Sequence, residues 1–110
     1  MTDQISEQDG CVIVALEGDV DLDRAPEVRS ELLECVGRGR DVLVDLSRVA
    51  YIDSSGIASL VEALQSAAKN GTALALIAVS AEALKVFRLA RLDKVFSIYP
   101  DLNSALAESR

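Results

Sequence analysis

Histidine and tryptophan are both absent from this 110-residue chain. Without an imidazole, the sequence excludes Ser-His and Cys-His catalytic pairs and every metal site that needs a histidine ligand. Only two cysteines are present, Cys11 and Cys35, which is too few for a disulfide scaffold or a zinc site. We expect both to be small buried apolar groups. With only two Tyr and two Phe, the core must be aliphatic.

Basic residues are also scarce relative to acidic ones. The chain has 11 Lys and Arg against 18 Asp and Glu, which gives a net charge of −7. A nucleic-acid-binding protein needs a basic footprint to neutralise phosphates, so this balance argues against that class. No run approaches the ~18 apolar residues of a membrane span, and the polar first ten residues lack the features of a signal peptide. We therefore expect a soluble, cytoplasmic protein.

Half of the residues are apolar, which is enough for a compact core in one domain over residues 1–110. Strand patterns are expected at 4–8, 11–17, 41–46, 74–79 and 97–99, and helical patterns follow residues 23, 53, 80 and 101. Asp9-Gly10 between the first two strands is a hairpin signal, whereas residues 47–53 are expected to form a turn and a short linker. This order predicts an α/β fold with a mixed, mostly parallel sheet of about four to five strands flanked by about four helices.

Capping residues set the expected helix ends. The residues expected to cap helices at their amino ends include Asp23, Ser80 and Asp101. Gly37 is expected to end the first helix. The clearest helical period in the chain runs from Ile57 to Ala68, and Asn70-Gly71 is expected to end that helix in left-handed geometry.

The segment Asp53-Ser54-Ser55-Gly56 lies between a strand and this best-defined helix. In open α/β sheets, ligands and partners meet the protein at such carboxyl ends of strands. One serine hydroxyl can cap free N–H groups while the other faces solvent, and Gly56 lets a partner approach the backbone closely. The segment is therefore either a helix-capping cluster with a spare hydroxyl or a phosphorylation switch. A phosphate would be favoured by the helix dipole and would repel a partner packed there.

Charged residues are unevenly distributed. Residues 1–55 carry 13 acids and 5 bases, whereas residues 56–110 carry 5 acids and 6 bases. The acids at 17, 19, 21 and 23 begin like a calcium loop, but Arg24 and Ser30 stand where that loop needs Gly and Glu. These acids form either a solvated rim or a partner-facing surface, with Asp21 as the candidate contact. Lys85, Arg88 and Arg91 share one helical face, which is either ordinary solvent-exposed surface or a docking surface.

No catalytic or cofactor motif is complete. The Gly37-x-Gly39 pair lacks the further glycine and the Lys-Ser of a phosphate-binding loop. Ser54 has no histidine to activate it, and a Ser-Lys pair stays open without a supporting feature. We therefore expect no enzyme activity, no cofactor and no metal, and an enzyme acting through Ser54 or Ser55 is the remaining alternative.

Around Asp53-Ser54-Ser55-Gly56-Ile57 the sequence resembles a STAS domain of the anti-sigma-factor antagonist family. The resemblance covers nearly the whole chain. Its other landmarks are Gly18-Asp19-Val20-Asp21, the strand at 42–46, Val49-x-x-Ile52, the segment 68–71 and the segment 92–96. The chain departs from the family at Ala58 and Arg91, where many members have glycine.

This resemblance implies both the fold and a function. Family members of this size bind an anti-sigma factor that is also a serine kinase, and thereby free a sigma factor for transcription. The kinase phosphorylates the first serine of the signature, here Ser54, which ends binding until a serine phosphatase reverses it. Asp21, Asp53, Ser55 and Gly56 would shape the docking surface of a monomer or weak dimer. The alternative is an accessory subunit of a cytoplasmic ABC-type phospholipid transport complex, where the domain braces the ATPase.

Overall fold

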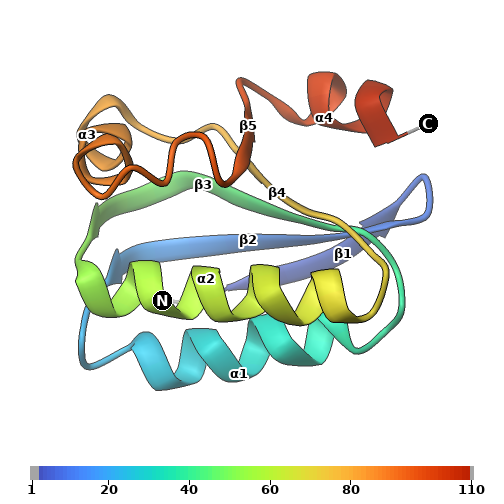
Figure 1. Cartoon of the computed structure of the whole chain (residues 1–110), viewed down its shortest axis with the longest axis horizontal. Coiled ribbons are helices and arrows are strands. Elements are labelled where there is room, and N and C mark those ends of the chain that lie inside the picture. Colours follow the sequence, from blue (N-terminus) through green and yellow to red (C-terminus); the bar gives the residue numbers. More distant parts are fainter. Residues whose placement is uncertain (1–2, 110) are drawn as a thin grey trace.

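The computed structural model of the protein describes residues 3–109, and within them strands and helices alternate in the predicted order (Figure 1). The elements are β1 Gln4–Gln8, β2 Cys11–Val20, α1 Ala25–Val36, β3 Val42–Ile52, α2 Ser54–Lys69, β4 Leu74–Ile77, α3 Ala81–Leu89, β5 Ser97–Tyr99 and α4 Leu102–Ser109. The strands lie in the order β1-β2-β3-β4-β5, with β1 antiparallel to β2 and the remaining pairs parallel. The predicted mixed, mostly parallel α/β fold is therefore confirmed.

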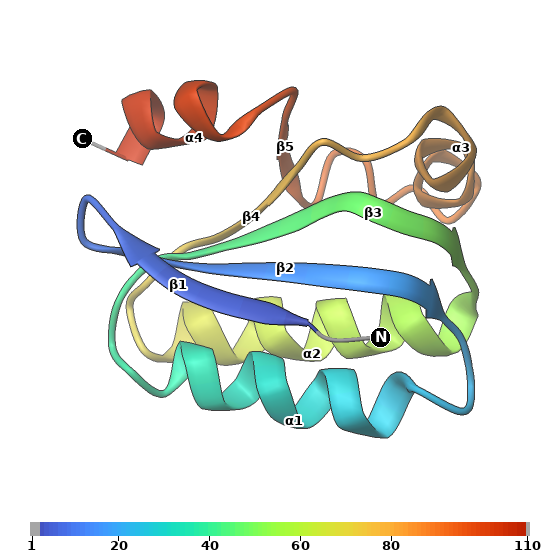
Figure 2. The same ribbon diagram turned by 180° about the vertical axis from the view of Figure 1, so that it is seen from behind.

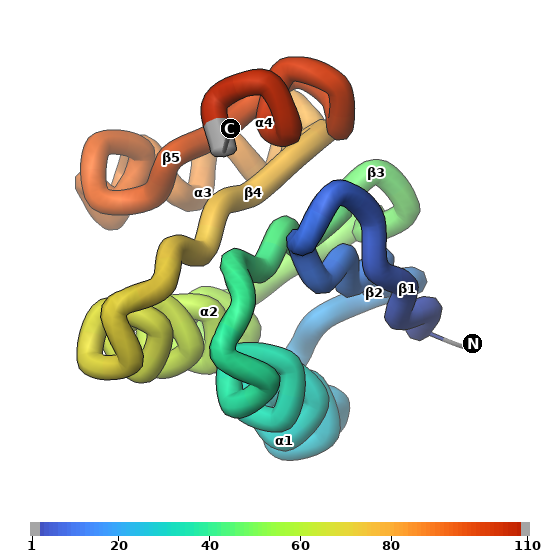
Figure 3. The backbone as a smooth tube through the Cα atoms, turned by 90° about the vertical axis from the view of Figure 1, so that its right-hand side faces the viewer, coloured from blue at the N-terminus to red at the C-terminus, as the bar shows by residue number. Residues whose placement is uncertain are grey.

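The sheet separates two groups of helices. α1 and α2 lie on one face, and α3 and α4 lie on the other (Figure 2 and Figure 3). Alternate residues of β2 serve both faces: Val12 and Val14 belong to the larger apolar cluster with α1 and α2, and Ile13 belongs to a smaller cluster with α4. Cys11 and Cys35 are both buried, as expected. Among the described residues, no helix combines the length and the apolar character that a bilayer span requires.

β3 is longer than the sequence pattern predicts. The expected turn and linker at 47–53 is wrong, because β3 continues to Ile52. Its second half pairs with β2, for example Glu17 with Arg48, across two register shifts. These irregularities interrupt the alternation of buried and exposed side chains, so the strand period disappears from the sequence while main-chain pairing continues. The longer strand carries the chain directly to Asp53 and the start of α2.

The other element ends follow local backbone chemistry. β4 stops at Ile77, short of the predicted residue 79, and the next residue, Ala78, takes a left-handed φ of +56°. Ser80 and Asp101 cap their helices as predicted, each accepting a hydrogen bond from the main-chain N–H three residues later. Gly71 has a φ of +75° after α2, which confirms the expected left-handed ending.

Candidate functional site

The loop after β2, residues 21–24, which we call the acidic loop, and the start of α2 lie together at the carboxyl end of the parallel strands (Figure 1). They are neighbours because β2 and β3 are adjacent and end at the same level, where Val20 pairs with Ile52. The Val20 carbonyl also accepts a hydrogen bond from the Asp53 N–H at 3.2 Å. The structure thus places Asp21 and the segment that begins at Asp53 on adjoining strand ends.

Asp53 caps α2 with its side chain. Its Oδ1 accepts hydrogen bonds from the N–H groups of Ser55, at 2.9 Å, and Gly56, at 3.1 Å. The expectation that one serine caps the helix is wrong, because this carboxylate reaches the same N–H groups with a full negative charge. Ser54 is left exposed, and its hydroxyl makes no hydrogen bond to any residue between 3 and 109. Ser55 is half-buried.

Gly56 lies against the sheet and not against solvent. The residue is buried, and a Cβ added to it would stand 2.5 Å from the Val20 carbonyl oxygen and 2.7 Å from Ile52 Cγ1. The interpretation that Gly56 opens the backbone to a partner is therefore wrong, since β2 makes the close approach that needs the glycine. This contact sets the distance between α2 and the sheet and so fixes where Ser54 is presented.

Asp21 closes the turn that leads into α1. Its Oδ1 accepts hydrogen bonds from the N–H groups of Asp23, at 3.1 Å, and Arg24, at 3.2 Å. The prediction that Asp23 caps α1 is wrong. Arg24 holds the N-cap position, and the carboxylate that accepts from the main chain belongs to Asp21, three residues before it. Asp21 is half-buried, so this turn holds its side chain in a defined position.

Ser59 is a site residue that the sequence analysis missed. Its side chain is buried, and its hydroxyl lies 3.2 Å from the main-chain oxygens of both Ala25 and Ser55. Ser59 therefore joins the first turns of α1 and α2. The available signal was a serine within an apolar helical face, which must find a hydrogen-bond partner when buried. A groove of about 300 Å³ lies beside it, lined by Leu22, Ala25, Pro26, Arg29, Ser30 and Ser59.

Arg24 ties the acidic loop to the beginning of the described chain. Its Nη1 donates to the main-chain oxygens of Glu17, at 2.6 Å, and Asp19, at 3.3 Å. Its Nη2 lies 2.5 Å from Asp3 Oδ2, and the Arg24 and Asp3 side chains are only 15% and 3% exposed. Because water has little access to this ion pair, it is screened less than a surface pair and braces the loop that holds Asp21.

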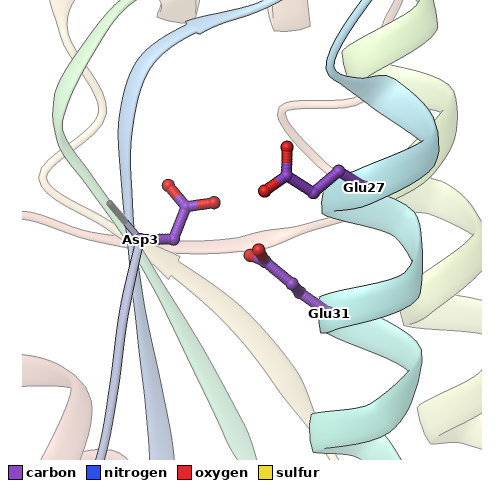
Figure 4. Close-up of side chains that lie close together, drawn as sticks. All are labelled: Asp3, Glu27 and Glu31. Carbon is purple, nitrogen blue, oxygen red and sulfur yellow. The ribbon is translucent and has the colours of Figure 1, made fainter. Parts of the chain in front are cut away.

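Two further carboxylates, Glu27 and Glu31, point from α1 toward Asp3 (Figure 4). The oxygens of the three side chains lie within 4.8 Å of one another, a spacing that could hold a cation, but the Arg24 guanidinium already supplies positive charge at Asp3. Burial, together with the hydrogen bond and negative charge of Asp3, raises the pKa of Glu31 to about 7. Near neutral pH the Glu31 carboxyl group is therefore partly protonated.

Replacing Glu31 with glutamine is expected to stabilise the protein at about pH 8 and to change little at about pH 5. The folded chain holds a proton on Glu31 that the unfolded chain, with a pKa near 4.5, releases. The stabilising contribution of this proton is complete below about pH 4.5 and is lost as the pH rises through about 7. Urea unfolding should show that Glu31→Gln raises the free energy of unfolding by about 1 kcal/mol at the higher pH. The gain is no larger because solvent screens part of the repulsion around Glu31.

The matched control for this experiment is Glu27→Gln, an exposed position one turn earlier on α1. This variant should show a smaller difference between the two pH values, because the pKa of Glu31 depends mainly on its own burial and on Asp3. A gain for Glu31→Gln that is equal at both pH values would contradict the protonated state assigned to Glu31.

The order of strands and the position of the signature segment define the class of protein. A small α/β domain with a five-stranded mixed sheet over the described residues, whose second long helix starts at Asp-Ser-Ser-Gly, has the architecture of a STAS domain. The family model described as "STAS domain" matches residues 4–105. The chain belongs to this family.

Individual relatives share most of the chain at low identity. The anti-sigma-B factor antagonist of Bacillus subtilis (strain 168) is 26% identical over 94 residues, which cover 86% of each chain. The crystal structure of an anti-sigma factor antagonist from Mycobacterium paratuberculosis has a TM-score of 0.89 and 27% identity, covering 97% of this chain and 92% of that one. The Bacillus cell fate determinant SpoIIAA in its phosphorylated form shares the fold, with a TM-score of 0.75 and 18% identity over 99% of this chain and 100% of that chain. The relatives of this STAS domain therefore include proteins named anti-sigma-factor antagonists.

Proposed function

We propose that the protein is an anti-sigma-factor antagonist whose binding to its partner is switched by phosphorylation of Ser54. The observation that carries this proposal is the exposed Ser54 hydroxyl at the first residue of α2, left unused because Asp53 caps the helix. The names of the Bacillus and Mycobacterium relatives support the antagonist function. The phosphorylated SpoIIAA structure supports the compatibility of this fold with a phosphate.

A phosphate on Ser54 would change charge more than shape. The N-terminus of α2 favours an anion through its dipole and its N–H groups. The added charge, about two units, would lie next to Asp53, on the strand end that adjoins the one leading to Asp21. A partner packed on this surface would meet like-charge repulsion and the cost of desolvating the phosphate. The switch therefore requires no rearrangement of β3 or α2.

The proposed docking surface consists of Asp21, Asp53 and Ser55 around Ser54, with Gly56 shaping it through its contact with β2. Hydrogen bonds to main-chain N–H groups hold both carboxylates in place, which supports a role in contact. The proposed partner is an anti-sigma factor with serine kinase activity, and a serine phosphatase would restore the unmodified state. In this proposal residues 1–110 act as one cytoplasmic domain, a monomer or weak dimer, that catalyses nothing itself.

The test is the binding of a serine-kinase anti-sigma factor from the same genome, measured by isothermal titration calorimetry. We expect Ser54→Ala to bind as the wild type does. Ser54→Glu, and wild-type protein phosphorylated by the kinase, should bind about 100-fold more weakly. The matched control is Ser6→Glu, which adds the same charge at an exposed serine of β1 and should keep wild-type affinity.

Equal affinities for Ser54→Ala and Ser54→Glu would contradict the switch. Mass spectrometry of the protein isolated from cells should find phosphate on Ser54. Co-purification with an ABC ATPase in place of a soluble kinase would replace this proposal with the transporter role.

A further inference from the structure

α3 and the turn after it carry an exposed surface of mixed character, which we name the basic-apolar patch. Its six residues are Lys85, Arg88, Leu89, Arg91, Lys94 and Val95. All six are exposed, and Leu89 and Val95 leave 86% and 54% of their surface open to water. The opposite side of α3 already serves the core, where Ala83 and Phe87 are buried. The six side chains of the patch therefore take no part in packing α3 against the sheet.

The cations of the patch differ from those in the first part of the chain. The four arginines before residue 41 each pair with an acidic side chain. The four patch cations form no ion pair with any residue that the structure describes. In a chain with 18 acidic residues, four cations within residues 85–94 that pair with no described acid are positive charge available to another molecule.

Arg91 holds its place in the patch at a conformational cost. Its φ is +60°, in the left-handed region that glycine adopts most readily. The N–H groups of Arg91 and Leu92 donate to the carbonyls of residues 88, at 3.0 Å, and 87, at 2.8 Å, and end α3 as a glycine ending would. The chain therefore accepts the strain of a non-glycine residue where α3 ends, and the Arg91 side chain is exposed there.

We propose that the basic-apolar patch binds an acidic segment of a protein partner that also carries apolar side chains. The guanidinium and ammonium groups match carboxylates in charge and hydrogen bonding, and Leu89 and Val95 offer apolar contact beside them. α3, which carries the patch, lies on the opposite face of the sheet from α2, which begins at Ser54 (Figure 1). The interaction therefore goes beyond the switch and does not depend on it.

An anionic bilayer matches this patch less well than a protein segment does. α3 has nine residues, and its apolar side packs into the core, so the helix cannot turn that side into a membrane. The acidic loop after β2 and the start of α2 lie at the same end of the sheet as α3 in both Figure 1 and Figure 2. A flat anionic surface would approach their carboxylates as well, whereas a peptide can follow the patch alone.

The test uses a fluorescent synthetic peptide of repeated Glu-Glu-Leu units, with a Gln-Gln-Leu counterpart as the uncharged control. We expect the 110-residue protein to bind the acidic peptide in a salt-sensitive manner, with amide NMR shifts concentrated between residues 85 and 95. The double variant Arg88→Gln/Arg91→Gln should bind about tenfold more weakly. The double variant Arg38→Gln/Arg40→Gln removes the same charge from ion-paired positions and should retain wild-type affinity.

Two single variants separate binding from folding. Arg91→Gly should raise the melting temperature, because it relieves the left-handed strain, and should still weaken peptide binding. Ser54→Glu should leave peptide binding unchanged, which distinguishes this proposal from the switch. Equal binding of both peptides, or wild-type affinity in Arg88→Gln/Arg91→Gln, would overturn the proposal. So would capture by phosphatidylglycerol vesicles without peptide binding, since it would assign the patch to a bilayer.

Discussion

Replacing Gly56 with alanine is expected to lower the free energy of unfolding by about 3 kcal/mol. The added methyl group would stand 2.5 Å from the Val20 carbonyl oxygen, which is main chain and is held in the sheet. It would also stand 2.7 Å from Ile52 Cγ1, so moving one side chain does not remove the clash. Either α2 moves away from β2 or the strand end distorts, and both displace Ser54. Urea unfolding followed by far-UV circular dichroism measures the loss.

The control for Gly56→Ala is Gly37→Ala, the same substitution at the end of α1. Gly37 has a helical φ of −63°, and the nearest atom to an added Cβ is a main-chain oxygen at 3.3 Å. The free energy of unfolding of the Gly37→Ala protein should differ from that of the wild type by no more than about 1 kcal/mol, because alanine suits this backbone conformation. A Gly56→Ala protein as stable as Gly37→Ala would show that α2 and β2 are not in the tight contact described above.

Truncating Phe87 to alanine is expected to cost about 3–5 kcal/mol of stability. Phe87 is fully buried and meets Phe96 edge to face, with ring centroids 5.7 Å apart. The pair joins α3 to the segment that leads into β5, in a protein with few other aromatic side chains. Its loss leaves a cavity that aliphatic neighbours cannot fill without moving. Chemical denaturation should show the loss, and hydrogen exchange should show α3 opening more readily.

Leu89→Ala is the matched control, since Leu89 lies on the same helix and is 86% exposed. Its stability should stay within about 0.5 kcal/mol of the wild type. If the two truncations cost the same, the packing of α3 against the sheet would be refuted. A Leu89→Ala protein of wild-type stability would also allow Leu89 to be tested in binding experiments with α3 intact.

The fold was largely predictable because the sequence periods match the elements. The apolar alternation of the first strands and the 3.6-residue period of α2 are local signals that packing reinforces. The second half of β3 was missed because its pairing with β2 is long-range, and its composition at 47–49 reads as a turn. A sequence period cannot report a strand whose main chain stays paired while its side-chain pattern is broken.

The candidate site was predictable in location but not in detail. The Asp53–Gly56 segment and Asp21 were found because strand ends and helix starts have characteristic residues. Which acid closes each turn was not predictable: Asp21 and Asp23 are equally suited by type, and only the backbone geometry selects Asp21. Gly56 and Val20, which are in contact, lie 36 positions apart in the sequence, so no local pattern indicates their contact.

The bond between Asp3 and Arg24 also affects how the protein is handled in the laboratory. It joins positions 21 residues apart, so the start of the described chain is coupled to the loop that presents Asp21. A fluorophore attached at Asp3 would break this ion pair and loosen the loop that holds Asp21, while Ser54 stays unmodified. A label at the exposed Asn70-Gly71 turn, beyond the far end of α2, avoids that artefact.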